Sequence, residues 1–137
     1  MPHPDYCHPQ IVHALEKDGW RVENQEVRIR TLARTVFIDA RASRPANGRS
    51  KQILLAEIKC FPDASSDTTE LYKALGQYIL YRAVLTELQD DTPLYLVIPE
   101  HIYDTVFEST ARRATSDNHI KLLIVNLETE AISQWIE

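Results

Sequence analysis

An acidic and a basic residue, Glu57 and Lys59, lie two positions apart in the aliphatic stretch LLAEIKCF (54–61). A strand rich in Leu, Ala and Ile is normally buried, and a buried charge is costly unless it is paired or holds a cation. Because strand side chains two positions apart share a face, the carboxylate and the ammonium group would project together. This pair is therefore the first candidate for chemistry.

A second carboxylate, Asp39, lies within the apolar segment TVFIDARA (35–42). We expect this segment to form a hairpin with the strand at 52–61, which would bring Asp39 close to Glu57 across the strand pair. Two neighbouring carboxylates repel each other unless a proton or a cation lies between them. The two segments together therefore predict a cation site.

The residue types around this pair suit a hard divalent ion facing a phosphate. Such an ion binds carboxylate oxygens and accepts a backbone carbonyl, for which Ile58 is the candidate. Lys59 would orient an attacking water molecule and stabilise charge on the phosphate. The alternative is that Glu57 and Lys59 form a simple salt bridge at a strand end, since E-x-K also arises by chance in many chains of this length.

Two further elements supply candidate residues. Lys73, Gln77 and Tyr81 are spaced i, i+4, i+8 in the predicted helix 67–88, so they share one face that can lie over the same site. An ordinary amphipathic helix with a polar flank would look the same. His8 opens the first predicted helix on its apolar side, where it is a candidate metal ligand or a hydrogen-bonded structural histidine.

Hydrophobic periodicity predicts an α/β fold in which a mixed sheet is flanked by helices. Asp67-Thr-Thr-Glu70 resembles a capping box at the start of the long helix, and Gly19 is expected to end the first helix. The predicted order is α-β-β-β-α-β-α-β-β, over residues 8–18, 20–30, 35–42, 52–61, 67–88, 94–99, 100–115, 120–127 and 131–137.

Length and composition limit the possible classes of protein. At 137 residues the chain is expected to form one domain, 1–137. It has no apolar run of about 18 residues and no apolar N-terminal segment, so we expect a cytoplasmic protein without a membrane helix. Cys7 and Cys60 form no C-x-x-C pair, and we expect two free thiols.

The charge distribution bears on nucleic-acid binding. A non-specific duplex binder usually carries a basic excess, whereas this chain has a net charge of −5. A local basic stretch lies between positions 28 and 51. It is either a nucleic-acid contact or a solvated pair of strands with their loop, and it contains Arg28, Arg30, Arg34, Arg41, Arg44, Arg49 and Lys51.

The motifs described above resemble those of known families. Asp39, then Glu57-Ile58-Lys59, then Gln77 and Tyr81 are similar to the D…E-x-K…Q-x-x-x-Y signature of the PD-(D/E)XK nucleases. The resemblance to the XisH family, whose members are called fdxN-element excision controlling factors, spans nearly the whole chain. It rests on HALEKDGW (13–20), AEIKCF (56–61), KALGQYILYR (73–82) and LLIVNLETEAISQWI (122–136).

This resemblance implies a restriction-endonuclease-like fold and a role in controlling site-specific excision of DNA, with an XisI-type protein as companion and a homodimer as a further arrangement. It also implies that Asp39 and Glu57 are metal ligands, that Lys59 orients water, and that Gln77 and Tyr81 support the site. Many nucleases of the superfamily have a glutamate where this chain has His8. An imidazole suits Mn²⁺ better than Mg²⁺.

Three hypotheses therefore follow from the sequence. In the first, the protein is a metal-dependent DNA endonuclease. In the second, it is a non-catalytic accessory protein that uses the nuclease fold to bind its companion or a recombinase. The acidic net charge and His8 favour this second hypothesis. In the third, the polar cluster is a buried network that only fixes the strand register.

Overall fold

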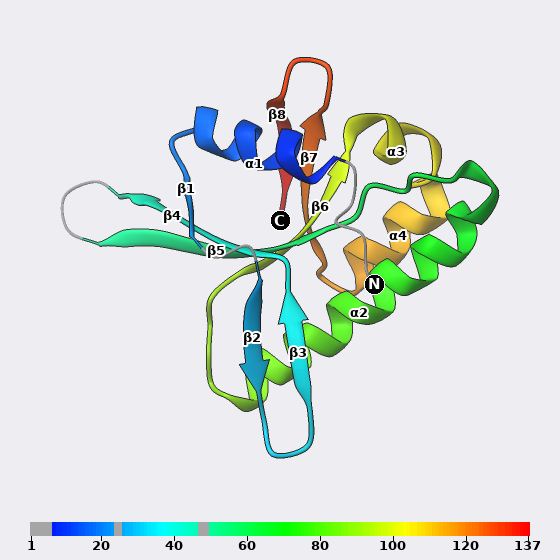
Figure 1. Cartoon of the computed structure of the whole chain (residues 1–137). Helices are drawn as coiled ribbons and strands as arrows, with labels where there is room; N and C mark the ends of the chain where they lie inside the picture. Colours follow the sequence, from blue (N-terminus) through cyan, green and yellow to red (C-terminus); the bar gives the residue numbers. More distant parts are fainter. Residues whose placement is uncertain (1–6, 24–25, 47–49) are drawn as a thin grey trace.

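The computed structural model describes residues 7–23, 26–46 and 50–137 as one six-stranded mixed sheet with helices on both faces and a separate two-stranded sheet (Figure 1). The predicted mixed α/β architecture is confirmed. The elements in chain order are α1 (His8–Lys17), β1 (Arg21–Glu23), β2 (Val27–Arg30), β3 (Thr35–Ile38), β4 (Ala40–Pro45), β5 (Lys51–Ile58), η1 (Ala64–Ser66), α2 (Asp67–Glu87), β6 (Leu94–Pro99), α3 (Glu100–Thr105), α4 (Ser109–Asp117), β7 (Lys121–Asn126) and β8 (Ala131–Ile136).

The strand order of the main sheet is β1-β4-β5-β6-β7-β8. The central pairs β5–β6 and β6–β7 are parallel, whereas the outer pairs β1–β4, β4–β5 and β7–β8 are antiparallel. β6 is buried along its whole length, as expected for a strand that is covered on both faces. None of the described helices combines the length and the apolar character that a membrane crossing requires.

Helix α1 covers one face of the sheet through Ile11, Ala14 and Leu15, which are buried in one core cluster with Leu54 and Ala56 of β5. The helix ends where the sequence predicts. Gly19 follows the C-cap with φ +91°, a left-handed conformation that glycine adopts without strain.

Helix α2 covers the opposite face. Tyr78 is buried there, and its hydroxyl donates a 2.7 Å hydrogen bond to the carbonyl oxygen of Leu94 at the start of β6. The predicted capping box at the start of the helix is wrong. Ser66 is the N-cap and makes no side-chain cap bond, while Asp67 and Glu70 lie within the first helical turn. Negative charges in the first turn still interact favourably with the positive N-terminal end of the helix dipole.

The extended segment 35–42 is not one strand, because the chain bends at Asp39 between β3 and β4. β3 pairs with β2 in the two-stranded sheet, whereas β4 pairs with β1 and β5 in the main sheet. Val36 and Ile38 therefore pack in the α2 cluster and Ala40 packs in the α1 cluster. In a continuous strand over 35–42, the period of two would put these three side chains on one face, and the bend at Asp39 prevents this.

The single helix expected over 100–115 is also divided in two. Phe107 between α3 and α4 is fully buried, and Glu108 caps α4 by accepting hydrogen bonds from the backbone N–H groups of Thr110 (3.0 Å) and Ala111 (2.8 Å). A side-chain cap of this kind satisfies N–H groups that a new helix start would leave unpaired.

Candidate functional site

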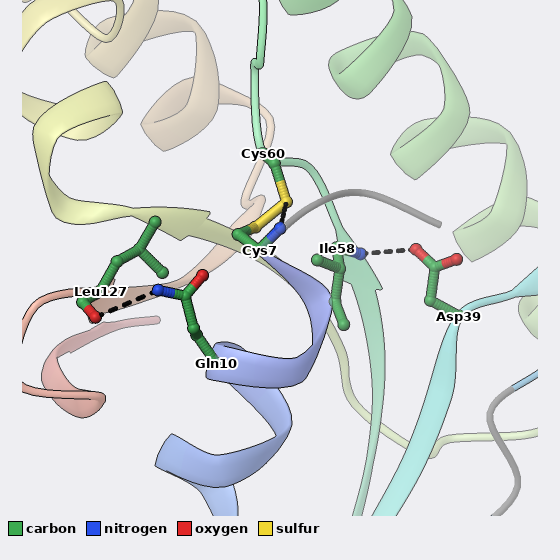
Figure 2. Close-up of a disulfide and its surroundings, with 6 residues drawn as sticks. All are labelled: Cys7, Gln10, Asp39, Ile58, Cys60 and Leu127. Carbon is green, nitrogen blue, oxygen red and sulfur yellow. Dashed lines mark hydrogen bonds between the residues drawn. A yellow bond between two sulfur atoms is a disulfide. The ribbon is translucent and has the colours of Figure 1, made fainter. Parts of the chain in front are cut away.

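The bend at Asp39 brings its side chain to the C-terminal end of β5. The carboxylate accepts a 2.7 Å hydrogen bond from the backbone N–H of Ile58 (Figure 2). The neighbouring register pair, Ala40 with Ala56, puts Asp39 beside Glu57 across the β4–β5 pair. The structure thus brings together the two carboxylates that the sequence singled out, although it does so through a bend and not through a continuous strand.

Glu57 is buried on the face of β5 that α2 covers, with a relative exposure of 4%. The pKa of Glu57 is raised from 4.5 to about 8, first by burial away from water and then by the negative charge of Asp39, while Lys59 partly opposes both effects. One carboxylate oxygen, Oε1, is buried without a hydrogen-bond partner. A native structure seldom leaves such an atom unpaired, and a hydrogen-bond donor or a cation at this position would satisfy it.

Lys59 shares the face of Glu57. Its ammonium nitrogen lies 3.8 Å from Oε2 of Glu57, and its side chain is 17% exposed. Its backbone N–H donates a 2.9 Å hydrogen bond to the carbonyl oxygen of Val97, which anchors the strand end to β6. The charged group is therefore held between the buried carboxylate and solvent.

Of the three residues expected from helix α2, Tyr81 is the one that interacts with the two carboxylates. Burial raises the pKa of Tyr81, and the negative charges of Glu57 and Asp39 raise it further, so the phenol lies within the field of both carboxylates. Gln77 precedes it by one turn, and its Oε1 atom is buried without a hydrogen-bond partner. Lys73 is exposed and lies 3.7 Å from Glu70 on its own helix, so the structure does not bring it to the site.

His8 does not join Asp39 and Glu57 in a cluster of metal ligands. Its Nε2 atom is buried and unpartnered. In the described part of the chain, however, no three His, Cys, Asp or Glu side chains gather as a metal cluster. The protein ligands available to an ion at Asp39 and Glu57 are therefore two carboxylates, together with the backbone carbonyl of Ile58.

These donors fit a hard divalent ion such as Mg²⁺ or Mn²⁺. Such ions keep several water ligands and need only one or two protein carboxylates. A cation between Asp39 and Glu57 would offset the repulsion that raises the pKa of Glu57 and would give its unpaired oxygen a partner.

A further cationic residue of this face, Arg41, belongs to the basic stretch of the sequence. Arg41 lies two positions after Asp39 on β4, and its Nε atom is buried without a hydrogen-bond partner. Hydrogen bonds from Thr92 lower the pKa of Asp90, and the positive charge of Arg41 contributes a smaller part of this shift. The period of two along the expected strand 35–42 puts Asp39 and Arg41 on one face, but the sequence alone does not show that part of the Arg41 side chain is buried there.

A disulfide joins Cys7 to Cys60, so the expectation of two free thiols is wrong (Figure 2). The two residues are 53 positions apart, and folding alone brings the N-cap of α1 to the end of β5. The bond ties α1 to the residue directly after Lys59. The next residue, Phe61, is buried and has φ +54°, an uncommon conformation for a bulky side chain.

The chain is similar to one protein family and to two proteins of known structure. A family model described as XisH protein matches residues 1–133. A crystal structure of an XisH family protein from Nostoc punctiforme PCC 73102 is 34% identical, with a TM-score of 0.85 over 97% of this chain and 100% of that one. The crystal structure of a fdxN element excision controlling factor protein from Anabaena variabilis is 31% identical, with a TM-score of 0.83 over 98% and 100% of the two chains. No curated protein sequence gives a significant match.

Proposed function

This chain belongs to the XisH family, and we propose that it controls site-specific DNA excision through a metal-dependent phosphodiester-cleaving site at Asp39, Glu57 and Lys59. The observation that carries the proposal is the pair of adjacent carboxylates with an unpaired buried oxygen and a lysine 3.8 Å away. Together with the helix residues Gln77 and Tyr81, this arrangement supports a relation to the PD-(D/E)XK nucleases and to their restriction-endonuclease-like fold.

The carboxylates of Asp39 and Glu57 and the carbonyl of Ile58 would hold Mg²⁺ or Mn²⁺. When bound, the ion supplies positive charge that offsets the charge of the phosphodiester. Glu57 has to lose its proton to bind a cation at neutral pH, because its pKa of about 8 keeps it largely protonated in the metal-free protein. Metal binding is therefore expected to release a proton and to tighten as the pH rises towards 8.

Lys59 has the main chemical role among the groups of the chain. Its ammonium group lies beside Glu57 and donates hydrogen bonds to an attacking water and to a nonbridging phosphate oxygen. The raised pKa of Tyr81 keeps its phenol protonated, so that it can donate to the same phosphate. The side chain of Gln77 has a free acceptor with which to hold the lysine or a bound water.

The first experiment is calorimetric titration of Mn²⁺, and then of Mg²⁺, in the presence of a short DNA duplex. Wild type should bind the ion and Asp39→Asn should not. Asp91→Asn is the matched control, because Asp91 is an exposed aspartate that is not part of the proposed site. This variant should bind the ion as wild type does. Loss of binding in both variants, or in neither, would refute the proposed metal ligands.

A second experiment separates metal binding from cleavage. Lys59→Met should still bind Mn²⁺ but should not nick supercoiled plasmid DNA, because it keeps both carboxylates and loses the group that holds the water. Lys73→Met is the control and should cleave normally, since Lys73 points away to Glu70. Cleavage by Lys59→Met at the wild-type rate would exclude lysine-assisted hydrolysis.

A second candidate function is a non-catalytic accessory role. It is favoured by the absence, among the described residues, of a third acidic or histidine ligand near the two carboxylates. In this case the fold binds an XisI-type companion or a recombinase without cleaving DNA. Co-purification with the companion at full yield after Lys59→Met, together with no cleavage by wild type, would support this function over the first.

A further inference from the structure

The β2–β3 hairpin is a projecting two-stranded ribbon that the proposed site does not use. We propose that its outward face is the surface that contacts duplex DNA, with Arg28, Arg30 and Arg34 binding backbone phosphates. This inference rests on the proposed function, because it takes DNA as the substrate of the Asp39–Glu57 site. It adds the surface that holds the substrate.

The hairpin has one face towards the protein and one towards solvent. Val27 and Ile29 of β2, and Val36 and Ile38 of β3, are buried in the same core cluster as residues of α2. The alternate side chains, those of Arg28, Arg30 and Phe37, are exposed. Figure 1 shows the hairpin extending away from the six-stranded sheet alongside α2. The outward face is therefore exposed to solvent, while the inward face of the hairpin is packed against the core.

The tip of the hairpin is closed by hydrogen bonds. The N–H of Thr31 donates to the carbonyl oxygen of Arg34 at 2.8 Å, and the N–H of Arg34 donates to Oγ1 of Thr31 at 3.0 Å. Leu32 at the tip is fully exposed. Arg34 is thus presented from an ordered turn, which lowers the entropy cost of binding.

The charge of the hairpin differs from that of the rest of the chain. Residues 27–38 contain three arginines and no acidic residue, although the whole chain has a net charge of −5. Within the described ranges, Arg28, Arg30 and Arg34 make no ion pair, whereas Arg44, Arg112 and Arg113 each pair with an aspartate. A polyanion complements this cationic surface on an otherwise acidic protein.

Strand geometry favours a duplex as the polyanion. Arg28 and Arg30 are two strand positions apart, a distance of about 7 Å, which is the axial rise of about two nucleotides of one DNA strand. A two-stranded β-ribbon also fits the major groove of B-DNA. Single-strand binding relies on several aromatic side chains for successive bases, and Phe37 is the one aromatic residue of this hairpin.

The hairpin is also continuous with the proposed site. Ile38 ends β3, and the next residue is Asp39, whose carboxylate is fixed to β5 by its hydrogen bond with Ile58. Phosphates held by the hairpin would therefore be kept at a set position relative to the two carboxylates. Such positioning is what a phosphodiester-cleaving site requires of its substrate contacts.

The test measures binding of a short fluorescent duplex by anisotropy in EDTA, where no cleavage occurs, at several salt concentrations. The variant Arg28→Gln/Arg30→Gln is compared with Arg21→Gln/Arg113→Gln, which removes the same charge from exposed positions elsewhere. We expect the hairpin variant to bind about tenfold or more weakly, with a salt slope lower by about two. The control should bind as wild type does.

The outcomes distinguish this inference from the function on which it rests. Equal binding by both double variants would overturn the hairpin surface while leaving DNA as the substrate. The anisotropy is measured in EDTA and so does not depend on Mn²⁺ binding at Asp39 and Glu57, which the calorimetric titration tests separately. If wild type binds no duplex, the inference is overturned, and binding of polyglutamate through Arg28 and Arg30 would then assign the hairpin to an acidic protein partner.

Discussion

The carboxylate of Asp39 accepts a 2.7 Å hydrogen bond from the backbone N–H of Ile58. This bond lies where the chain leaves the β2–β3 sheet and enters the main sheet. The same side chain therefore holds the bend and provides one of the two negative charges of the candidate site. Fold stability and site geometry are coupled at this residue.

Two substitutions of Asp39 distinguish its role in stability from its role as a negative charge of the site. Asp39→Ala leaves the N–H of Ile58 without its acceptor and is expected to lower the free energy of unfolding by about 1–3 kcal/mol. Asp39→Asn keeps an acceptor oxygen and should cost less. Urea denaturation in EDTA measures both. Equal stability of the two variants would show that the hydrogen bond does not hold the bend.

The raised pKa of Glu57 predicts a specific pH dependence of stability. Its ordinary value is 4.5 and its value in the folded protein is about 8, so the folded state retains a proton that the unfolded chain loses between these pH values. The stability of the metal-free protein should therefore fall as the pH rises from about 4.5 to 8 and level off above 8. The fall is on the order of 5 kcal/mol for this group.

Glu57→Gln is the variant that checks this prediction. An uncharged side chain of the same size removes the titration, so the difference in unfolding free energy between wild type and Glu57→Gln should follow the same pH window. Asp39→Asn should reduce the fall without abolishing it, because burial is the larger cause of the raised pKa. A difference that does not change with pH would contradict the assignment.

The sequence predicts the parts of this site that depend on local patterns and not the parts that depend on contacts between distant residues. The period of two along β5 is a local property, so Glu57 and Lys59 could be paired from the sequence. The bend at Asp39 depends on a side-chain bond to a residue 19 positions away, which no local pattern encodes. The division between α3 and α4 likewise follows from burial of Phe107, a tertiary effect. The pairing of Cys7 with Cys60 is likewise a contact between distant residues, which no local pattern encodes.

The disulfide leads to a third prediction. Closing a loop between residues 53 positions apart restricts the unfolded chain and stabilises the fold by about 4 kcal/mol in the loop-entropy model. Cys7→Ala/Cys60→Ala should lose a stability of this order. Reductant should destabilise wild type and leave the double variant unchanged. A wild type insensitive to reductant would contradict the pairing.

The last prediction concerns Gln89, the residue that follows the C-cap of α2. Gln89 follows the C-cap Leu88 and has φ +56°. Gly19 occupies the equivalent position after the C-cap of α1. A left-handed conformation strains any residue with a Cβ, so Gln89→Gly is expected to raise the free energy of unfolding by about 0.5–1 kcal/mol. Gly19→Ala should lower it by about 1 kcal/mol.

Gly76 supplies the matched control for this pair. It lies within α2, and a Cβ added there would meet no atom within 4 Å. Gly76→Ala should therefore stabilise the protein by up to about 1 kcal/mol, through helix propensity alone. Urea denaturation of the three variants should give opposite signs for the two Gly→Ala substitutions. The same sign for both would show that backbone conformation at the helix end does not decide the effect.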